Sequence, residues 1–211
     1  MSETKKKILD VALHLYNENG FANTSIRQLA KEMNISHSNL IYHFPTHEEV
    51  IVGLHDQLLK NAISINRELD TNNSVIRSLF ESTKTGFTVV YNYRFLFLEL
   101  QYICSAHPKI KQIIISVEGM RSEMYRGLID KMILKELMRK EEFEGEYNQL
   151  ITLIKIYSDH WIVSSTIYDE LNKEEKIKKY AYLLMNFFYP YLTNSGKSEF
   201  NSIQITAPSP H

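Results

Sequence analysis

Apolar residues recur every three or four positions along most of the chain, which is the spacing that places them on one face of a helix. The first such segment covers about residues 3–19. Its apolar face would consist of Ile8, Leu9, Ala12, Leu13 and Tyr16. Gly20 follows and would end this helix, because glycine accepts the left-handed backbone found after many helices. The chain is therefore predicted to begin with an amphipathic helix.

Residues 24–44 predict two short helices joined by a tight turn. Thr24 or Ser25 can cap the N-terminus of the first helix. Asn34 tolerates a left-handed backbone where that helix must stop, and Ser36 can cap the second helix two residues later. Two helices in this arrangement form a helix-turn-helix.

The second of these helices separates apolar from polar side chains. Leu40, Ile41 and Phe44 would turn inward. The outward face would carry hydrogen-bonding side chains: His37, Ser38, Asn39, Tyr42 and His43. Because a helix fits the major groove of DNA and such side chains can pair with base edges, this stretch indicates DNA recognition.

Helical spacing continues behind this module. Pro45 ends the second short helix, because proline disrupts helical hydrogen bonding. Residues 46–49 form a capping box that starts a helix of about 24 residues. Further helices are predicted over about residues 74–92, 108–140, 146–171 and 173–193. Residues 93–106 are apolar on most sides, which predicts a central place in the second domain. The chain has 7 glycines and 5 prolines, so helix breakers are few and the predicted fold class is all-α. From residue 194 onward, the Ser, Asn, Gly and Pro content predicts a disordered tail.

Composition excludes several classes of protein. The 44% apolar and 23% charged content is ordinary for a globular protein, and no apolar run approaches the ~18 residues of a membrane-spanning helix. The N-terminus lacks the apolar segment of a secretion signal. Cys104 is the single cysteine, so no internal disulfide can form, which fits a reducing compartment. We therefore expect a cytoplasmic protein without a membrane partner.

Charge supports DNA binding only slightly. The net charge is −1, whereas many nucleic-acid-binding proteins carry a basic excess. Residues 1–47 have a small excess of Lys and Arg over acidic residues, and the basic residues gather at positions 5–7. Charge therefore leaves an alternative function open: a dimeric helical ligand-binding or interaction protein with a weak or vestigial DNA module.

The ordered set of residues in the first part of the chain resembles the TetR/AcrR family of bacterial transcriptional regulators. The resemblance covers roughly residues 4–56 and rests on these elements: Asn19-Gly20-Phe21, Thr24-Ser25, Leu29-Ala30, Ile35-Ser36, Tyr42-His43-Phe44 and Thr46-x-Glu48-Glu49. The chain departs from the family pattern at His37 and His47, where Lys is frequent, and at Ile41, where Tyr is frequent.

The resemblance implies an N-terminal three-helix helix-turn-helix DNA-binding domain (residues 1–47). It also implies a helical-bundle ligand-binding and dimerisation domain (residues 48–193), followed by the tail (residues 194–211). A homodimer would present two recognition helices to a palindromic operator in double-stranded DNA. Candidates for DNA contact are Thr24, Arg27, Ser36, His37, Ser38, Asn39, Tyr42, His43 and His47.

The second domain is rich in aromatic residues and methionines, which either form core or line a cavity. The resemblance implies a cavity, whose apolar lining would suit a small apolar or aromatic effector. Candidate lining residues are Phe87, Tyr91, Phe95, Tyr102, Met120, Met124 and Trp161.

The last two predicted helices carry more apolar surface than one buried face requires, so part of it is either core or interface. Members of the family dimerise by packing these two helices against the same pair in a partner as a four-helix bundle. Candidate dimer residues are Tyr157, Trp161, Tyr168, Tyr180, Leu184, Phe187, Phe188 and Tyr191.

The sequence offers little chemistry for catalysis. It contains no GxSxG, HExxH, Walker or GxGxxG motif. Cys104 and His107 are the nearest approach to a metal pair, but two ligands without a second pair favour a buried cysteine beside a helix-capping histidine. We therefore expect no catalytic residue, no metal site and no cofactor. The predicted function is that of a DNA-binding transcriptional repressor released by a small apolar or aromatic ligand.

Overall fold

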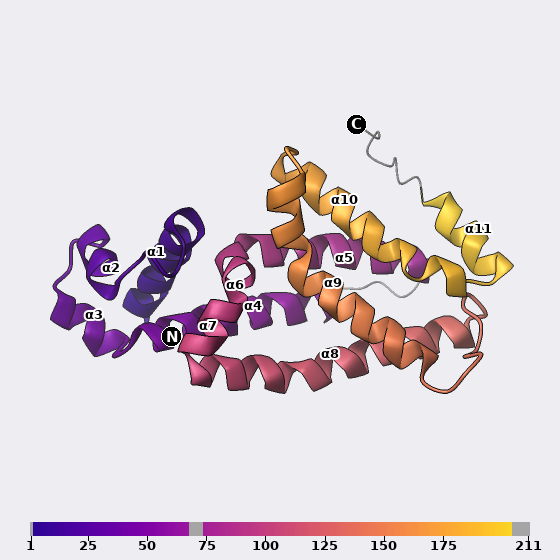
Figure 1. The fold of residues 1–211 in the computed structure, drawn as a ribbon, viewed down its shortest axis with the longest axis horizontal. Coiled ribbons are helices and arrows are strands. Elements are labelled where there is room, and N and C mark those ends of the chain that lie inside the picture. The colour runs from indigo at the N-terminus through magenta and orange to yellow at the C-terminus, as the bar shows by residue number, and fades with distance from the viewer. Residues whose placement is uncertain (1, 68–73, 204–211) are drawn as a thin grey trace. The chain divides into compact units, whose positions relative to one another are not determined.

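The computed structural model describes residues 2–67 and 74–203, without the side chains of residues 65–67. Figure 1 shows the elements in chain order: α1 (Glu3–Asn19), α2 (Ile26–Glu32), α3 (His37–His43), α4 (His47–Arg67), α5 (Val75–Asn92), α6 (Arg94–Leu98), α7 (Leu100–Ala106), α8 (Pro108–Leu134), α9 (Glu146–Tyr168), α10 (Lys173–Asn186), the 3₁₀-helix η1 (Tyr189–Tyr191) and α11 (Asn194–Ser202). Extended pairing among the described residues is limited to an isolated antiparallel bridge between Met138 and Leu192. The prediction of an all-α fold is confirmed.

The described chain divides into two compact units. Unit 1 consists of residues 2–63 and 89–115, and unit 2 consists of residues 64–67, 74–88 and 116–203. Unit 1 is therefore larger than the predicted first domain, because it includes most of α4 together with α6 and α7. The functional division at residues 47 and 48 stays a prediction.

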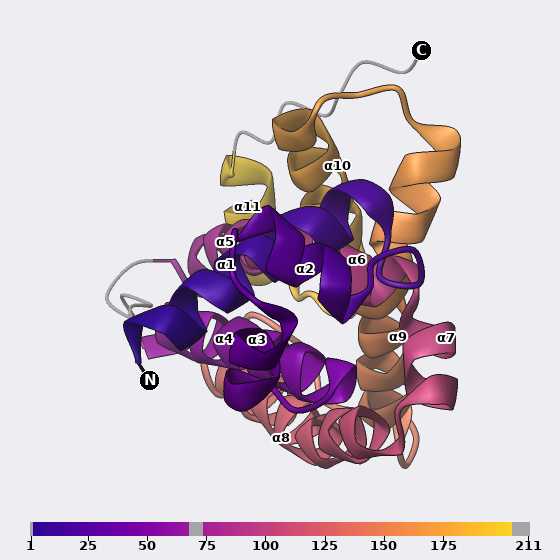
Figure 2. The same ribbon diagram turned by 90° about the vertical axis from the view of Figure 1, so that its left-hand side faces the viewer.

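Local sequence signals start and end the first three helices as expected. Ser25 and Gln28 form a capping box at the start of α2, and Ser36 Oγ accepts the N–H of Asn39 at the start of α3. Asn34 has a left-handed φ of 54° at the end of α2, and Gly20 has a φ of 83° after α1. Figure 2 shows α1, α2 and α3 grouped together within unit 1.

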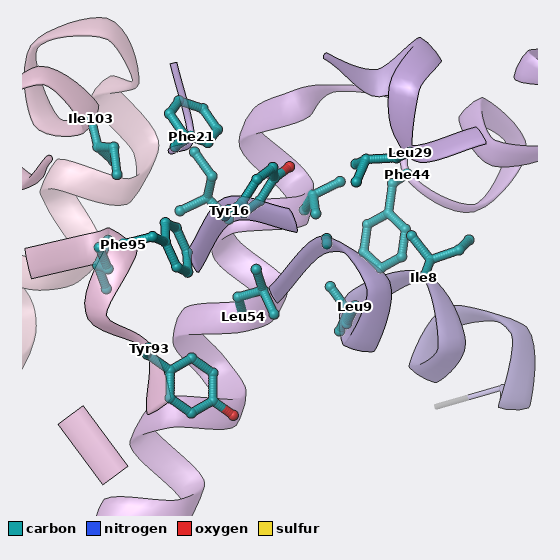
Figure 3. Close-up of a cluster of buried hydrophobic side chains, with 14 of the residues drawn as sticks. Ile8, Leu9, Tyr16, Phe21, Leu29, Phe44, Leu54, Tyr93, Phe95 and Ile103 are labelled. Carbon is teal, nitrogen blue, oxygen red and sulfur yellow. The ribbon is translucent and has the colours of Figure 1, made fainter. Parts of the chain in front are cut away.

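The core of unit 1 joins the helix-turn-helix to later helices of the same unit. Its buried residues include Ile8, Leu9, Tyr16, Phe21, Leu29, Leu40, Phe44, Leu54, Phe95 and Ile103. Figure 3 shows the Tyr16 ring between Phe21 and Phe95, which is a residue of α6. The ring centroids of Tyr16 and Phe21 are 5.2 Å apart, and those of Tyr16 and Phe95 are 5.1 Å apart. The helix-turn-helix therefore shares one apolar core with α4, α6 and α7.

Unit 2 has an aromatic core and a charged seam. The Trp161 and Phe87 rings stack with centroids 4.7 Å apart, and the Tyr157 hydroxyl donates to the Tyr180 carbonyl across α9 and α10. Between α8 and α9, the Arg121 guanidinium lies 2.9 Å from the Asp159 carboxylate. These contacts attach α9 to helices on several sides.

Residues 194–202 correct the prediction of a disordered tail. They form α11, whose first turn is capped by the Thr193 hydroxyl, and Phe200 is buried against Tyr189. At Gly196 a Cβ atom would collide with the Leu137 carbonyl oxygen, so only glycine allows this helix to approach so closely. The polar composition of this segment predicted disorder. It could not reveal the few tertiary contacts, at Gly196 and Phe200, that hold α11 in place. Residues 204–211 of the predicted tail lie outside the described residues.

Candidate DNA-binding interface

The outward face of α3 is polar, as predicted. His37, Ser38 and Asn39 are exposed, and Tyr42 is 83% exposed. Leu40 is fully buried and anchors the helix. Because the caps use backbone N–H groups and Ser36, the side chains of Asn39 and Tyr42 are available to hydrogen-bond base edges or phosphates.

Residues on both sides of α3 extend this polar surface. Arg27 and Lys31 are exposed on α2, and His43 is half-buried at the end of α3, where its ring meets Tyr42 edge-on. Ser36 is exposed as well, although its hydroxyl is partly engaged, because it caps α3 and contacts the Ser38 hydroxyl at 3.1 Å. The positive charges of Arg27 and Lys31 would attract the DNA backbone.

Two predicted positions of the helix-turn-helix behave differently in the structure. Thr24 is only 3% exposed, and its hydroxyl donates to the Gly20 carbonyl at 2.8 Å, so it stabilises the turn instead of facing outward. Ile41, which the spacing places inward, is 36% exposed. Thr24 precedes α2 and is buried in the turn after α1, whereas Ile41 is exposed because the packing of α3 buries Leu40 and Phe44 instead, which local spacing does not specify.

His47 also departs from the predicted DNA-facing set. Its ring stacks on Phe21 with centroids 4.3 Å apart, and lies 5.4 Å from the Tyr16 ring. Within the described residues, its Nε2 is buried without a hydrogen-bond partner. Burial, together with a smaller contribution from His107, lowers the pKa of His47 to about 4. A neutral, inward-facing imidazole is poorly placed to neutralise a phosphate.

The structure brings together only some of the predicted ligand-binding residues. Phe87 and Trp161 stack in unit 2, where Met120 and Met124 are exposed on α8. Tyr91, Phe95 and Tyr102 belong to unit 1, and Phe95 is buried in its core. A cleft of about 380 Å³ in unit 1 is lined by other residues: Asp10, Leu13, His14, Asn17, Asn61, Asn92, Tyr93 and Arg94. The ligand-binding set stays a prediction.

The predicted dimer residues lie mainly inside unit 2. Trp161, Tyr180, Leu184 and Phe188 are buried, Tyr157, Phe187 and Tyr191 are half-buried, and Tyr168 is exposed. A different face of α9 exposes apolar side chains: Leu153 (56%), Ile156 (56%) and Ile167 (64%). Leu183 of α10 is exposed too. In the sequence, Ile156 follows Leu153 by three residues and Ile167 follows Ile156 by eleven, and these spacings place all three on one helical face. This was the signal from which a second apolar face could have been predicted.

Other classes of site are not supported among the described residues. They contain no cluster of three metal-ligating side chains. None of the helices over the described ranges is long and apolar enough to cross a membrane.

A capped helix-turn-helix with a polar, exposed second helix defines a class of DNA-binding proteins. Comparison with known proteins identifies the family. The family model described as "Bacterial regulatory proteins, tetR family" matches residues 8–54, and the model described as "Bacterial transcriptional repressor" matches residues 59–200. The chain therefore belongs to the TetR family of bacterial transcriptional regulators, whose members are not enzymes.

Relatives and solved structures agree with this assignment. The biofilm operon icaADBC HTH-type negative transcriptional regulator IcaR of Staphylococcus aureus (strain Newman) is 22% identical, over 87% of this chain and 98% of the relative. A TetR-family regulator from Marinobacter aquaeolei VT8 has the same fold, with a TM-score of 0.86 at 18% identity over 98% of this chain and 100% of that chain. The TetR-family regulator PfmR from Thermus thermophilus has a TM-score of 0.68 at 20% identity, over 85% of this chain and 97% of that chain.

Proposed function

We propose that this TetR-family regulator is a cytoplasmic repressor that binds a palindromic operator as a homodimer and releases it when a small molecule binds. The observation that carries the proposal is the exposed polar face of α3 on a buried, capped scaffold. A negative regulator among the relatives supports repression over activation.

Base recognition is assigned to α3. An Asn amide can pair with adenine through two hydrogen bonds, so Asn39 is the main candidate for base contact. Ser38, Tyr42 and His43 would flank it, and Arg27 would reach a neighbouring guanine or phosphate. His37 is exposed at the start of α3, where it would meet the DNA backbone. These roles leave Thr24 and His47 as structural supports.

Dimerisation is assigned to the exposed apolar face of α9 together with Leu183 of α10. Such a face costs free energy in water and is typical of an interface. Its position on the last long helices agrees with the four-helix bundle that the family uses. A two-fold axis through this bundle would give two α3 helices and a palindromic site.

Effector binding is assigned to the second domain, residues 48–193. The Phe87–Trp161 stack is apolar and buried, so a ligand that reached it would have to be apolar or aromatic. Release of DNA would follow if the ligand favoured a conformation in which the helix-turn-helix no longer matches the operator.

The decisive experiment is fluorescence polarisation with labelled DNA from upstream of the protein's own coding region, in the presence of excess random-sequence DNA. Retention of the label by the protein supports the regulator. Absence of binding even at low salt, where phosphate contacts are strongest, would instead favour the dimeric interaction protein with a vestigial DNA module.

A further inference from the structure

A carboxylate at the junction of α6 and α7 holds the loop that follows α1. Glu99 Oε1 accepts the Phe21 N–H at 2.6 Å, and Glu99 Oε2 accepts the Ala22 N–H at 3.0 Å. Both oxygens of one carboxylate are therefore used on two consecutive backbone donors. Hydrogen bonds to a charged acceptor are stronger than those between neutral groups.

Gly20 makes room for this contact. Its φ is 83°, and a Cβ atom at this position would lie 2.9 Å from Glu99 Oε1. The glycine that ends α1 thus also allows the carboxylate to reach the loop.

A second carboxylate, on α4, makes a similar contact with the start of α8. Glu48, in the first turn of α4, accepts the Lys109 N–H at 2.9 Å in the first turn of α8. An acceptor at a helix N-terminus is favourable because the N–H groups there have no partner within the helix. Glu99 precedes α7 and Lys109 follows it, so α7 is attached to the α1–α2 loop at one end and to the first turn of α4 at the other.

Aromatic contacts fill the space between these two attachments. The Phe21 ring stacks on His47, meets His107 edge-on with centroids 5.3 Å apart, and lies 6.3 Å from Tyr102 of α7. Phe21 therefore contacts the start of α4 and the end of α7 while its own N–H is bound to Glu99. Figure 3 shows Phe21 beside the core residues Tyr16, Phe95 and Ile103.

We propose that Glu99 and Glu48 are positioning residues for operator recognition, and that α7 is the element through which the helix-turn-helix is held in its DNA-binding orientation. The proposal rests on the proposed function. It adds a specific route between unit 2 and the helix-turn-helix. This route is α8, which begins in unit 1, where Lys109 binds Glu48, and continues into unit 2. A shift of α7 or α8 would act on the α1–α2 loop and on α4 together.

The first test uses the free protein. Hydrogen exchange is measured at the Phe21 and Ala22 amides in the wild type, Glu99→Ala, Glu48→Ala and the double variant. Glu99→Ala removes the acceptor directly, so protection falls there. If α7 acts as one element, Glu48→Ala also lowers protection of these amides, although it touches neither. Unchanged protection in Glu48→Ala would overturn the coupling through α7, whether or not the protein binds DNA.

The second test uses operators whose half-sites are moved apart or together by about one or two base pairs. Each single variant should bind the natural spacing roughly 10-fold more weakly and lose preference for it, and the double variant should be little worse than either. Glu81→Ala is the matched control, since Glu81 is an exposed carboxylate that pairs with Lys84 in unit 2. A folded Glu99→Ala that keeps wild-type affinity and spacing preference would show that Glu99 only stabilises the fold.

Discussion

At the scale of single residues, exposure on α3 decides which side chains can read DNA. Asn39 and Tyr42 point outward because Leu40 and Phe44 are buried beneath them. The same helix leaves Ile41 partly exposed, so its outer face is less uniformly polar than the spacing predicted.

Replacing Asn39 with alanine should selectively weaken operator binding. Loss of a bidentate contact to a base costs about 1–3 kcal/mol, whereas binding to random DNA rests on phosphate contacts and should change little. Fluorescence polarisation with both DNAs measures the two affinities. An equal loss on operator and random DNA would remove Asn39 from base recognition.

His47 should make folding stability depend on pH between about 4 and 6.5. The folded protein holds this imidazole neutral down to about pH 4, whereas the unfolded chain takes up a proton below about 6.5. Stability is therefore lost as the pH falls through this window, by at most about 1.4 kcal/mol per pH unit. Denaturant unfolding of wild type and His47→Phe across this range measures the difference.

The phenylalanine variant keeps the stack on Phe21 and lacks the titrating nitrogen, so its stability should fall less steeply toward low pH. His37→Gln provides the control, because His37 is exposed on α3. Parallel profiles for wild type and His47→Phe would mean that the His47 ring is solvated in solution.

At the scale of secondary structure elements, α9 shows why spacing alone does not say which apolar face of a helix is buried. Apolar residues occur on several of its faces, and only tertiary packing assigns one face to Phe87 and Tyr180 and leaves another exposed. The face of α9 with Leu153, Ile156 and Ile167 is therefore exposed in the single chain, which is why the proposed interface lies there.

Ile156→Glu should convert the dimer to a folded monomer. The substitution places a charge in the proposed interface, while the side chain is 56% exposed in the single chain and the fold should tolerate it. Ile115→Glu is a matched control, since Ile115 is 57% exposed on α8. Sedimentation velocity measures the oligomeric state. A dimeric Ile156→Glu, or a control that also dissociates, would place the interface elsewhere.

Two glycines in helices should respond oppositely to alanine. Gly196→Ala should destabilise the protein by more than about 1 kcal/mol, because its Cβ would collide with the Leu137 backbone. Gly119→Ala on α8 has open space around the new methyl group and should stabilise by about 0.5–1 kcal/mol. Thermal unfolding of both variants checks the contrast. Equal effects would mean that α11 does not pack closely on Leu137.

At the scale of the whole molecule, ligand response requires that the second domain and the DNA-binding region be energetically coupled. The chain passes between the two units three times, within α4, α5 and α8. The Glu99 and Glu48 contacts link α7 and the start of α8 to the α1–α2 loop and to α4.

A small aromatic ligand bound near Phe87 should lower operator affinity about 5- to 150-fold, which corresponds to a coupling of about 1–3 kcal/mol. Trp161 is the single tryptophan of the chain and stacks on Phe87, so its fluorescence reports binding there. Compounds found by this signal are then titrated into the protein–operator complex. Compounds that quench Trp161 but leave the complex intact would argue for a core without a regulatory site.

Much of the fold could be predicted because its signals are local. Ser25, Asn34 and Ser36 act on backbone groups within a few residues, and they determine where α2 and α3 begin and end wherever these helices pack. The ordered residues from Asn19 to Glu49 likewise identified the family, which the matches over residues 8–54 and 59–200 confirmed.

Tertiary structure decided the features that depend on residues distant in sequence. Glu99 meets Phe21 across 78 positions, and Glu199 accepts the Ile76 N–H across 123, so no local pattern indicates either contact. The inward turn of His47, the exposed face of α9 and the anchoring of α11 have the same origin. Periodicity determined that each helix has apolar faces, but packing determined which face was buried, because burial depends on what lies opposite.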